Sequence, residues 1–149
     1  MAVPGGPAAA FPVGGRLPAL AVDVSDGSRL ALPSPSAAGG EVLVLNFWAS
    51  YCAPCRAEAP ILSSLHARPD VRVVGLAIEG FPHEQTLRAA QALGIRYPIA
   101  ECDRPLLEKL RVHAVPTTYV IATDGAIVLS RVGAVSESEL LAAIAKAKR

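Results

Sequence analysis

The stretch that decides the fold covers residues 42–55, which read Val-Leu-Val-Leu-Asn-Phe-Trp-Ala-Ser-Tyr-Cys-Ala-Pro-Cys. Its first seven residues are nearly all apolar, as is typical of a strand covered on both faces of a sheet. Two cysteines separated by two residues end the stretch, and apolar residues at helical spacing follow them. The stretch therefore predicts a buried strand that passes into a helix through a Cys-x-x-Cys turn.

The cysteine pair at this junction has the chemistry of a redox site. The unpaired N–H groups of the first helical turn point toward Cys52, and the helix dipole favours an anion there, so the reactive thiolate is stabilised. Cys55 can reach the sulfur of Cys52 and resolve a mixed disulfide formed on it. Pro54 suits the first helical turn, and we expect it to leave Cys52 exposed. These residues favour thiol–disulfide exchange.

Strands and helices alternate along the rest of the chain, which predicts an α/β domain. A second apolar run at residues 71–78 forms a parallel strand–helix–strand unit with the first. Residues 1–16 are rich in Pro, Gly and Ala and are expected to be a flexible N-terminal arm, with the domain over residues 17–149. The other expected elements are a hairpin over 17–32, a loop over 33–40, helices over 55–67, 82–93 and 105–110, strands over 97–100, 117–122 and 126–132, and a last helix opened by a capping box of Ser136 and Glu139.

Composition and charge exclude several classes of protein. The chain has 149 residues, 52% of them hydrophobic, which suits one domain with an ordinary core. No apolar run reaches the roughly 18 residues of a membrane span. The 14 basic and 13 acidic residues nearly cancel, which argues against a nucleic-acid partner. Residues 1–7 lack the features of a secretory signal, so we expect either a cytoplasmic protein or one whose leader has been removed.

Metal binding is the main alternative use of two close thiols. A structural zinc site usually has four ligands in closely spaced pairs, and Cys102, His66, His83 and His113 form no such second pair. We therefore expect no zinc, and the three histidines are interpreted as surface or loop residues. Copper held by the two thiolates stays open, because soft ligands suit Cu(I).

The third cysteine has a different setting. Cys102 precedes Asp103, which is a residue type that caps helices. A buried free cysteine usually behaves as a small hydrophobic side chain, and this is the interpretation we favour for Cys102. A regulatory or resolving thiol is the alternative.

Two segments resemble the motifs of a known family. Residues 48–60 read Trp-Ala-Ser-Tyr-Cys-Ala-Pro-Cys-Arg-Ala-Glu-Ala-Pro, and residues 115–121 read Val-Pro-Thr-Thr-Tyr-Val-Ile. They are similar to the TlpA/ResA-like thiol–disulfide oxidoreductases of the thioredoxin superfamily, and the likeness extends from residue 17 to residue 144. It implies a thioredoxin-like fold, with a central mixed sheet flanked by helices, an N-terminal hairpin and a helix–strand insertion over residues 82–100.

The resemblance also implies substrate-binding residues. In that family the proline matching Pro116 is cis and faces the cysteines, and the backbone of Val115 would bind an extended substrate segment by strand addition. Tyr51, Pro54 and Trp48 are the other expected substrate-binding residues. Trp48 has an alternative interpretation as a core residue that ends a buried strand.

Two polar residues flank the dithiol in sequence. Asn46 stands where thioredoxin has a buried acid. Glu58 follows Cys55 by about one helical turn, and we hypothesise that it is a third catalytic residue that tunes the thiol pKa values and moves protons. The alternative is a solvated glutamate favoured by the helix dipole.

The favoured function is that of an enzyme that reduces disulfides in proteins, with a redox-active Cys52–Cys55 disulfide and no cofactor. Family members usually work in the periplasm or cell envelope, often on apocytochrome or copper-site thiols during processes such as cytochrome c maturation. The expected partners are protein substrates and an upstream electron donor, and a monomer is expected. Family members are either soluble or held by a membrane tether, which would lie outside this sequence. A dithiol metallochaperone is the alternative. A peroxidase of the peroxiredoxin kind is disfavoured, because its Pro-x-x-x-Thr-x-x-Cys arrangement is absent around Cys52.

Overall fold

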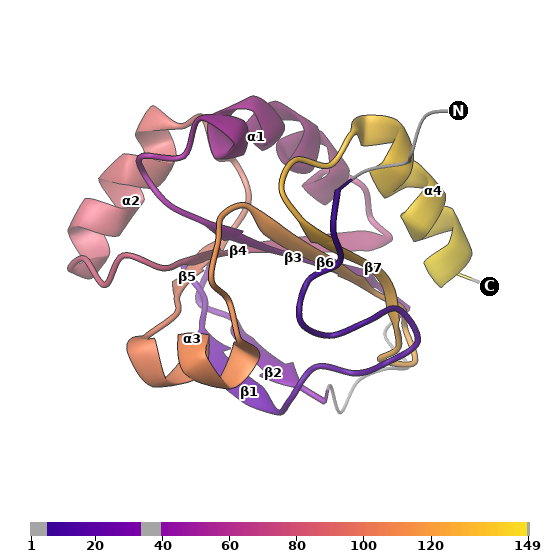
Figure 1. The fold of residues 1–149 in the computed structure, drawn as a ribbon. Coiled ribbons are helices and arrows are strands. Elements are labelled where there is room, and N and C mark those ends of the chain that lie inside the picture. Colours follow the sequence, from indigo (N-terminus) through magenta and orange to yellow (C-terminus); the bar gives the residue numbers. More distant parts are fainter. Residues whose placement is uncertain (1–5, 34–39, 149) are drawn as a thin grey trace.

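A five-stranded mixed sheet forms the centre of the molecule (Figure 1). The computed structural model describes residues 6–33 and 40–148. The strand order is β5-β4-β3-β6-β7, with β3 parallel to β4 and antiparallel to β6. The elements are β1 (Leu20–Asp23), β2 (Arg29–Leu32), β3 (Val42–Trp48), α1 (Ala53–His66), β4 (Val71–Ala77), α2 (His83–Ala92), β5 (Ile99–Glu101), α3 (Arg104–Leu110), β6 (Thr117–Ile121), β7 (Ile127–Val132) and α4 (Glu137–Ala147). The predicted thioredoxin-like architecture is confirmed, including the hairpin and the helix–strand insertion.

Strand β3 lies in the middle of the sheet and is buried along its whole length. Side chains alternate between the two faces of a strand, and the core follows this alternation. Val42 and Val44 pack with α1 and α4, whereas Leu43, Leu45 and Phe47 pack with the hairpin side. The even-numbered residues of β3, including Asn46, therefore belong to the face that carries the helix of the dithiol.

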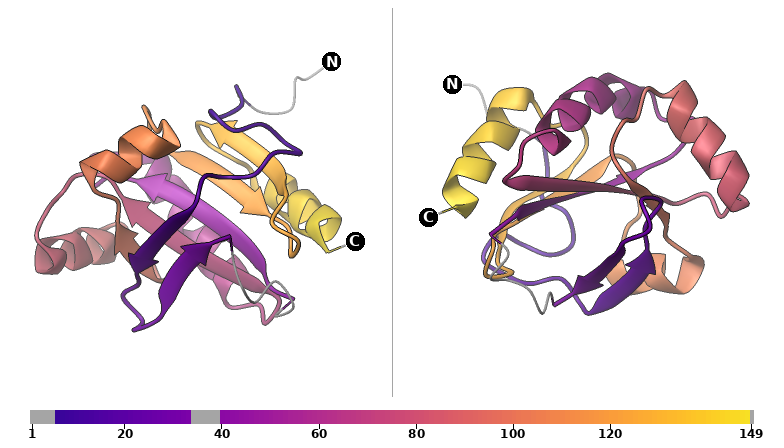
Figure 2. Two further views of the ribbon diagram at one scale, coloured as in Figure 1. Left: turned by 90° about the horizontal axis from the view of Figure 1, so that it is seen from below. Right: turned by 180° about the vertical axis from the view of Figure 1, so that it is seen from behind.

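Each face of the sheet has its own cover. Helices α1, α2 and α4 lie over one face in Figure 1. The opposite face is covered by the β1–β2 hairpin and α3, as the view from below in Figure 2 shows. In the described chain, no helix has both the length and the apolar character that a membrane crossing needs.

The N-terminal segment differs from the loose arm that its composition predicts. Residues 6–16 lie against β7: the Ala9 N–H donates to Ser130 Oγ (3.1 Å), and the Gly14 N–H donates to the Ile127 carbonyl (2.9 Å). Sequence patterns miss these contacts because they join positions more than 100 residues apart. Residues 1–5 of the arm and residues 34–39 of the expected loop lie outside the described residues, and the division of the chain at residue 17 stays a prediction.

Candidate active site

Cys52 is the N-cap residue of α1 and forms a disulfide with Cys55. The Cα atoms of the two cysteines lie 5.2 Å apart, and the Cys55 N–H donates to Cys52 Sγ over 3.2 Å. A helix N-terminus leaves backbone N–H groups without partners inside the helix, and here one of them points at the sulfur. The local geometry therefore supplies the anion-stabilising environment that the sequence predicts for Cys52.

The residues of the active-site turn differ in their exposure to solvent. Cys52 is 6% exposed and Cys55 is 2% exposed, so the expectation that Pro54 leaves Cys52 open to solvent is wrong for this oxidised form. Pro54 is itself exposed, and Tyr51 is 72% exposed. The more accessible cysteine is nevertheless the N-cap residue, which is the one expected to attack a substrate.

The Val115–Pro116 peptide bond is cis, as the family resemblance implies. This bond directly precedes β6, and Thr117 at the start of β6 pairs with Phe47 near the end of β3. The cis-proline turn therefore lies at the same end of the strands as the segment that carries the two cysteines. Val115 is half-buried and packs against the cluster that contains both cysteines, while Pro116 is buried. The two predicted motifs thus meet in space, with Val115 in contact with the dithiol cluster.

Trp48 lies in the core and not at the protein surface. It is 1% exposed and packs in the apolar cluster that includes Cys52 and Cys55. Its indole lies close over Gly75 of the neighbouring strand, where a Cβ atom would lie 3.0 Å from Trp48 Nε1. The prediction that Trp48 binds substrate is therefore corrected: the absent side chain of Gly75 makes room for the indole in the core beneath the dithiol.

Glu58 is a buried carboxyl group on the same side of α1 as Cys55. It is 4% exposed, which excludes the solvated first-turn glutamate. Its Oε2 accepts from the Val135 N–H (2.7 Å), and its Oε1 accepts from Asn46 Nδ2 (3.3 Å). Burial raises the pKa of Glu58, and the hydrogen bonds from Val135 and Asn46 oppose that rise. The protonation state of the Glu58 carboxyl group therefore depends on its burial and on the hydrogen bonds from Val135 and Asn46.

Sequence patterns did not identify these partners of Glu58. Asn46 also donates to Thr118 Oγ1 (3.0 Å), its neighbour across β3 and β6. Tyr97 lies near enough that the negative charge of Glu58 contributes to raising the Tyr97 pKa, together with the larger effect of burial. A polar residue in an otherwise apolar strand was a visible signal for Asn46, but the strand register that adds Thr118 is not local information.

The other candidate ligands and thiols lie apart from the dithiol. Cys102 is a buried free thiol, and burial together with the charge of Asp103 raises its pKa to about 12. His66 Nδ1 accepts from the Val73 N–H (3.1 Å), and His83 Nδ1 lies 3.1 Å from the Glu101 carboxylate. Within residues 6–33 and 40–148, His, Cys, Asp and Glu form no group of three or more that could hold a metal ion.

The sequence and fold of this chain are similar to those of known thiol–disulfide oxidoreductases. The sequence pattern described as the AhpC/TSA family matches residues 13–130. The chain is 26% identical over 129 residues to the thiol-disulfide oxidoreductase ResA of Bacillus subtilis, which covers 84% of this chain and 70% of that protein.

Solved structures share the fold. A candidate thiol:disulfide interchange protein DsbE from Chlorobium tepidum superimposes with a TM-score of 0.75 at 23% identity, covering 94% of this chain and all of that one. A secreted Mycobacterium tuberculosis disulfide oxidoreductase, described as homologous to DsbE of E. coli, superimposes with a TM-score of 0.66 at 24% identity, covering 85% of this chain and 95% of that one.

Proposed function

The chain belongs to the AhpC/TSA family and is a thiol–disulfide oxidoreductase, and we propose that it reduces disulfide bonds in other proteins through Cys52 and Cys55. The observation that carries the proposal is the Cys55 N–H pointing at Cys52 Sγ, at the N-terminus of α1. The same N–H would stabilise a thiolate at this position after reduction.

The first step is attack on the substrate disulfide. The reduced Cys52 thiolate bonds to one substrate sulfur, the substrate S–S bond breaks, and the other substrate sulfur leaves as a thiolate that takes a proton from solvent. The product is a mixed disulfide between Cys52 and the substrate. Cys52 is assigned this step because it is the N-cap residue and the less buried of the two cysteines.

The second step releases the reduced substrate. Cys55 loses its proton and attacks Cys52 Sγ, so that the internal disulfide forms and the second substrate sulfur leaves as a thiolate. Two electrons have then passed from the protein to the substrate, and the Cys52–Cys55 disulfide is the oxidised product. A dithiol electron donor must return two electrons before the next cycle.

Glu58 is proposed to accept the proton of Cys55 in this second step. It lies on the buried side of α1, three residues after Cys55. Burial raises its pKa, which makes its carboxylate a better base than an exposed glutamate. Asn46 and the Val135 N–H hold the two carboxylate oxygens and so limit the positions that Glu58 can take.

Substrate docking is proposed at the surface formed by Tyr51, Pro54 and the half-buried Val115, with the buried Pro116 fixing the turn beneath them. Tyr51 and Pro54 are exposed beside the dithiol, and Val115 packs against the cluster that holds it. An extended substrate chain would form backbone hydrogen bonds with Val115, a mode that makes little demand on substrate sequence. Such a surface fits protein substrates.

The reducing direction and the setting outside the cytoplasm are the remaining parts of the proposal. The Cys-Ala-Pro-Cys turn has a proline before its second cysteine, as in family members that act as reductases. The description of one structural neighbour as secreted supports a periplasmic or cell-envelope location. In the proposed setting, the protein is a monomer that receives electrons from an upstream dithiol protein.

Trapping the mixed disulfide tests the proposed roles. The reduced Cys55→Ser variant, incubated with insulin, is expected to accumulate a mixed disulfide on Cys52, and the matched Cys52→Ser variant is expected to accumulate none. Redox titration of the unmodified chain against glutathione tests the direction. A potential near the roughly −270 mV of thioredoxin supports a reductase, whereas a potential near the roughly −120 mV of a strong oxidant overturns that direction.

The same preparations address the alternatives. A dithiol metallochaperone would co-purify with copper and form no mixed disulfide, and a peroxidase would consume hydrogen peroxide with an added dithiol. Either result, combined with failure to reduce insulin, would replace the proposed function.

A further inference from the structure

Arg131 of β7 carries a buried guanidinium group outside the dithiol site. Its side chain is 9% exposed, and its Nη2 donates to Glu139 Oε2 of α4 over 2.7 Å. Its Nε and Nη1 have no hydrogen-bond partner among the described residues. An ion pair between a buried guanidinium that is only partly hydrogen-bonded and a partly exposed carboxylate contributes little net stability, because desolvation offsets the attraction between the charges. The pair therefore matters less for overall stability than for the position in which it holds Glu139 at the start of α4.

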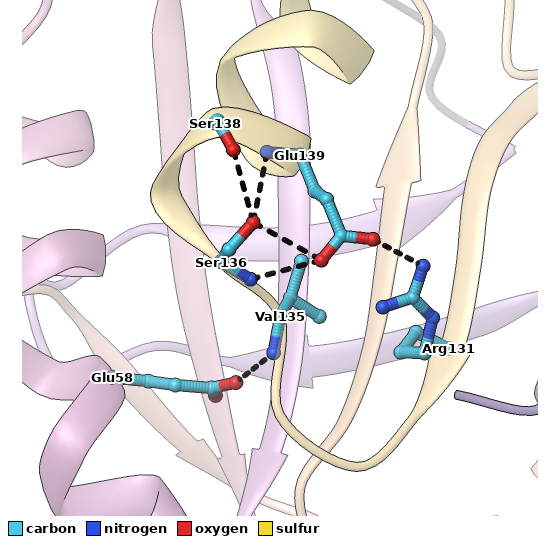
Figure 3. Close-up of polar contacts among 6 residues, drawn as sticks. All are labelled: Glu58, Arg131, Val135, Ser136, Ser138 and Glu139. Atoms are coloured by element: carbon cyan, nitrogen blue, oxygen red, sulfur yellow. Dashed lines mark hydrogen bonds and ion pairs between the residues drawn. The ribbon is translucent and has the colours of Figure 1, made fainter. Parts of the chain in front are cut away.

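The carboxylate that Arg131 binds also begins α4. Glu139 Oε1 accepts from the Ser136 N–H (3.2 Å), and Ser136 Oγ accepts from the Glu139 N–H (3.2 Å), which together form a capping box. Figure 3 shows this box and the arginine on one side of the helix start. The hydrogen bond from Arg131 lowers the pKa of Glu139 to about 2, with help from Ser136. Glu139 therefore stays charged at every pH at which the protein would work.

The residue before the capping box contacts the site directly. The Val135 N–H donates to Glu58 Oε2 over 2.7 Å, and it is the backbone group drawn against Glu58 in Figure 3. Two residues earlier, the Gly133 N–H donates to the Pro116 carbonyl over 2.8 Å. The segment from residue 133 to residue 136 thus joins the buried carboxyl group, the cis-proline turn and the start of α4.

We infer that Arg131, Ser136 and Glu139 are positioning residues for Glu58, because they fix the start of α4 so that the Val135 N–H stays on the Glu58 carboxylate. The inference rests on the role proposed above for Glu58. If the start of α4 loosens, this hydrogen bond weakens, and burial then acts on Glu58 with only Asn46 against it.

Several other groups face Glu58 and must be separated from this effect. Asn46 comes from β3, Tyr97 from the segment before β5, and Cys55 lies on the buried side of α1 three residues before Glu58. In the disulfide form the cysteines do not titrate, and the pKa of Tyr97 is raised far above neutral pH. Titrating the oxidised protein therefore reports Glu58 without coupling to the thiols.

The test follows the side-chain carboxyl carbon of Glu58 by ¹³C NMR as a function of pH in the oxidised, full-length chain. In the Ser136→Ala and Glu139→Ala variants, we expect the midpoint to rise by roughly half to one pH unit, since two or three backbone N–H bonds together can lower a carboxyl pKa by about two units. The matched control is Asp103→Ala, which removes the cap of α3, where Asp103 Oδ1 accepts from the Leu106 N–H (3.0 Å). We expect no shift in this control.

An unchanged Glu58 midpoint in both α4 variants, or an equal shift in the Asp103→Ala control, would overturn the inference. If Glu139→Ala does not fold because Arg131 is left unpaired, Ser136→Ala decides alone, since it removes only the cap. The titration needs no substrate, so its outcome is independent of the insulin experiment. A protein that fails to reduce insulin but shows the shift refutes the proposed function and keeps the positioning role.

Discussion

Cys52 and Cys102 both lie between a strand and a helix, yet their surroundings differ in one respect. Cys52 follows β3 and is itself the N-cap of α1, so its sulfur accepts a backbone N–H. Cys102 follows β5 but precedes the N-cap of α3, which is Asp103. The carboxylate of Asp103 takes the place at the helix N-terminus that a sulfur occupies in α1.

A shift of one residue thus separates two thiol environments. At α1 the positive end of the helix faces sulfur, which stabilises a thiolate. At α3 the helix N-terminus is occupied by a carboxylate, and burial together with the charge of Asp103 raises the pKa of Cys102 to about 12. Both cysteines are almost fully buried, so burial by itself does not decide which one reacts.

The largest expected effect comes from removing each sulfur in turn. Cys52→Ala is expected to reduce insulin at the uncatalysed rate, because the attacking atom is gone. Cys102→Ala is expected to retain the rate of the unmodified protein. Insulin turbidity with a limiting dithiol donor measures both variants, and a large loss of activity in Cys102→Ala would give this thiol a role that its environment does not predict.

The second effect is selectivity toward alkylation. At pH 7, a thiol with a pKa of about 12 is ionised about 10³-fold less than an ordinary thiol with a pKa of roughly 8.5. In the reduced protein, iodoacetamide should therefore modify Cys52 at least about 10³-fold faster than Cys102. Peptide mapping by mass spectrometry measures the two rates. Comparable rates would contradict the claim that the environments of Cys52 and Cys102 give the two thiols different reactivity.

The third effect concerns stability and pH at the dithiol end. Burial raises the folded-state pKa of Glu58, so its protonated form is favoured by folding. Relative to Glu58→Gln, the unmodified protein should be most stable below the unfolded-state pKa of glutamate and should lose stability as pH rises through the folded-state pKa. Each unit of pKa shift corresponds to about 1.4 kcal/mol.

Urea unfolding of the oxidised proteins between pH 4 and pH 8 measures this difference in the free energy of unfolding. If the difference in the free energy of unfolding between the two proteins stays constant from pH 4 to pH 8, folding does not raise the pKa of Glu58.

The smallest effect is expected at the other helix. Asp103→Asn keeps a capping side chain but removes the negative charge beside Cys102. Because burial is the larger cause of the raised Cys102 pKa, alkylation of Cys102 should increase only several-fold, on the scale of less than one pKa unit. The same iodoacetamide mapping measures the alkylation rate of Cys102. If the substitution raises this rate to that of Cys52, the charge of Asp103, and not burial, is the main cause of the raised Cys102 pKa.

Local signals in the sequence predicted the elements and the dithiol well. The continuous apolar run at residues 42–48 indicated β3, and the spacing of Ser136 and Glu139 indicated the capping box of α4 that the structure contains. These features depend on neighbours a few residues apart. The cis form of the peptide bond before Pro116 was predicted from the family resemblance instead.

Long-range packing was the part that sequence patterns could not supply. The burial of Trp48 depends on Gly75 in the neighbouring strand, which leaves space for the indole. The contact between Glu58 and the Val135 N–H joins residues 77 positions apart. Neither contact has a local signature, because each depends on strand register and helix placement together.

The most direct test of the account is the pH dependence of alkylation at Cys52 in a chain whose other two cysteines are replaced (Cys55→Ser with Cys102→Ala). If the helix N-terminus stabilises the Cys52 thiolate, the rate of reaction with iodoacetamide reaches half its maximum at a lower pH than in an unstructured peptide with one cysteine. A half-maximal rate at the same or a higher pH would contradict the claim that the N-terminus of α1 makes this sulfur reactive.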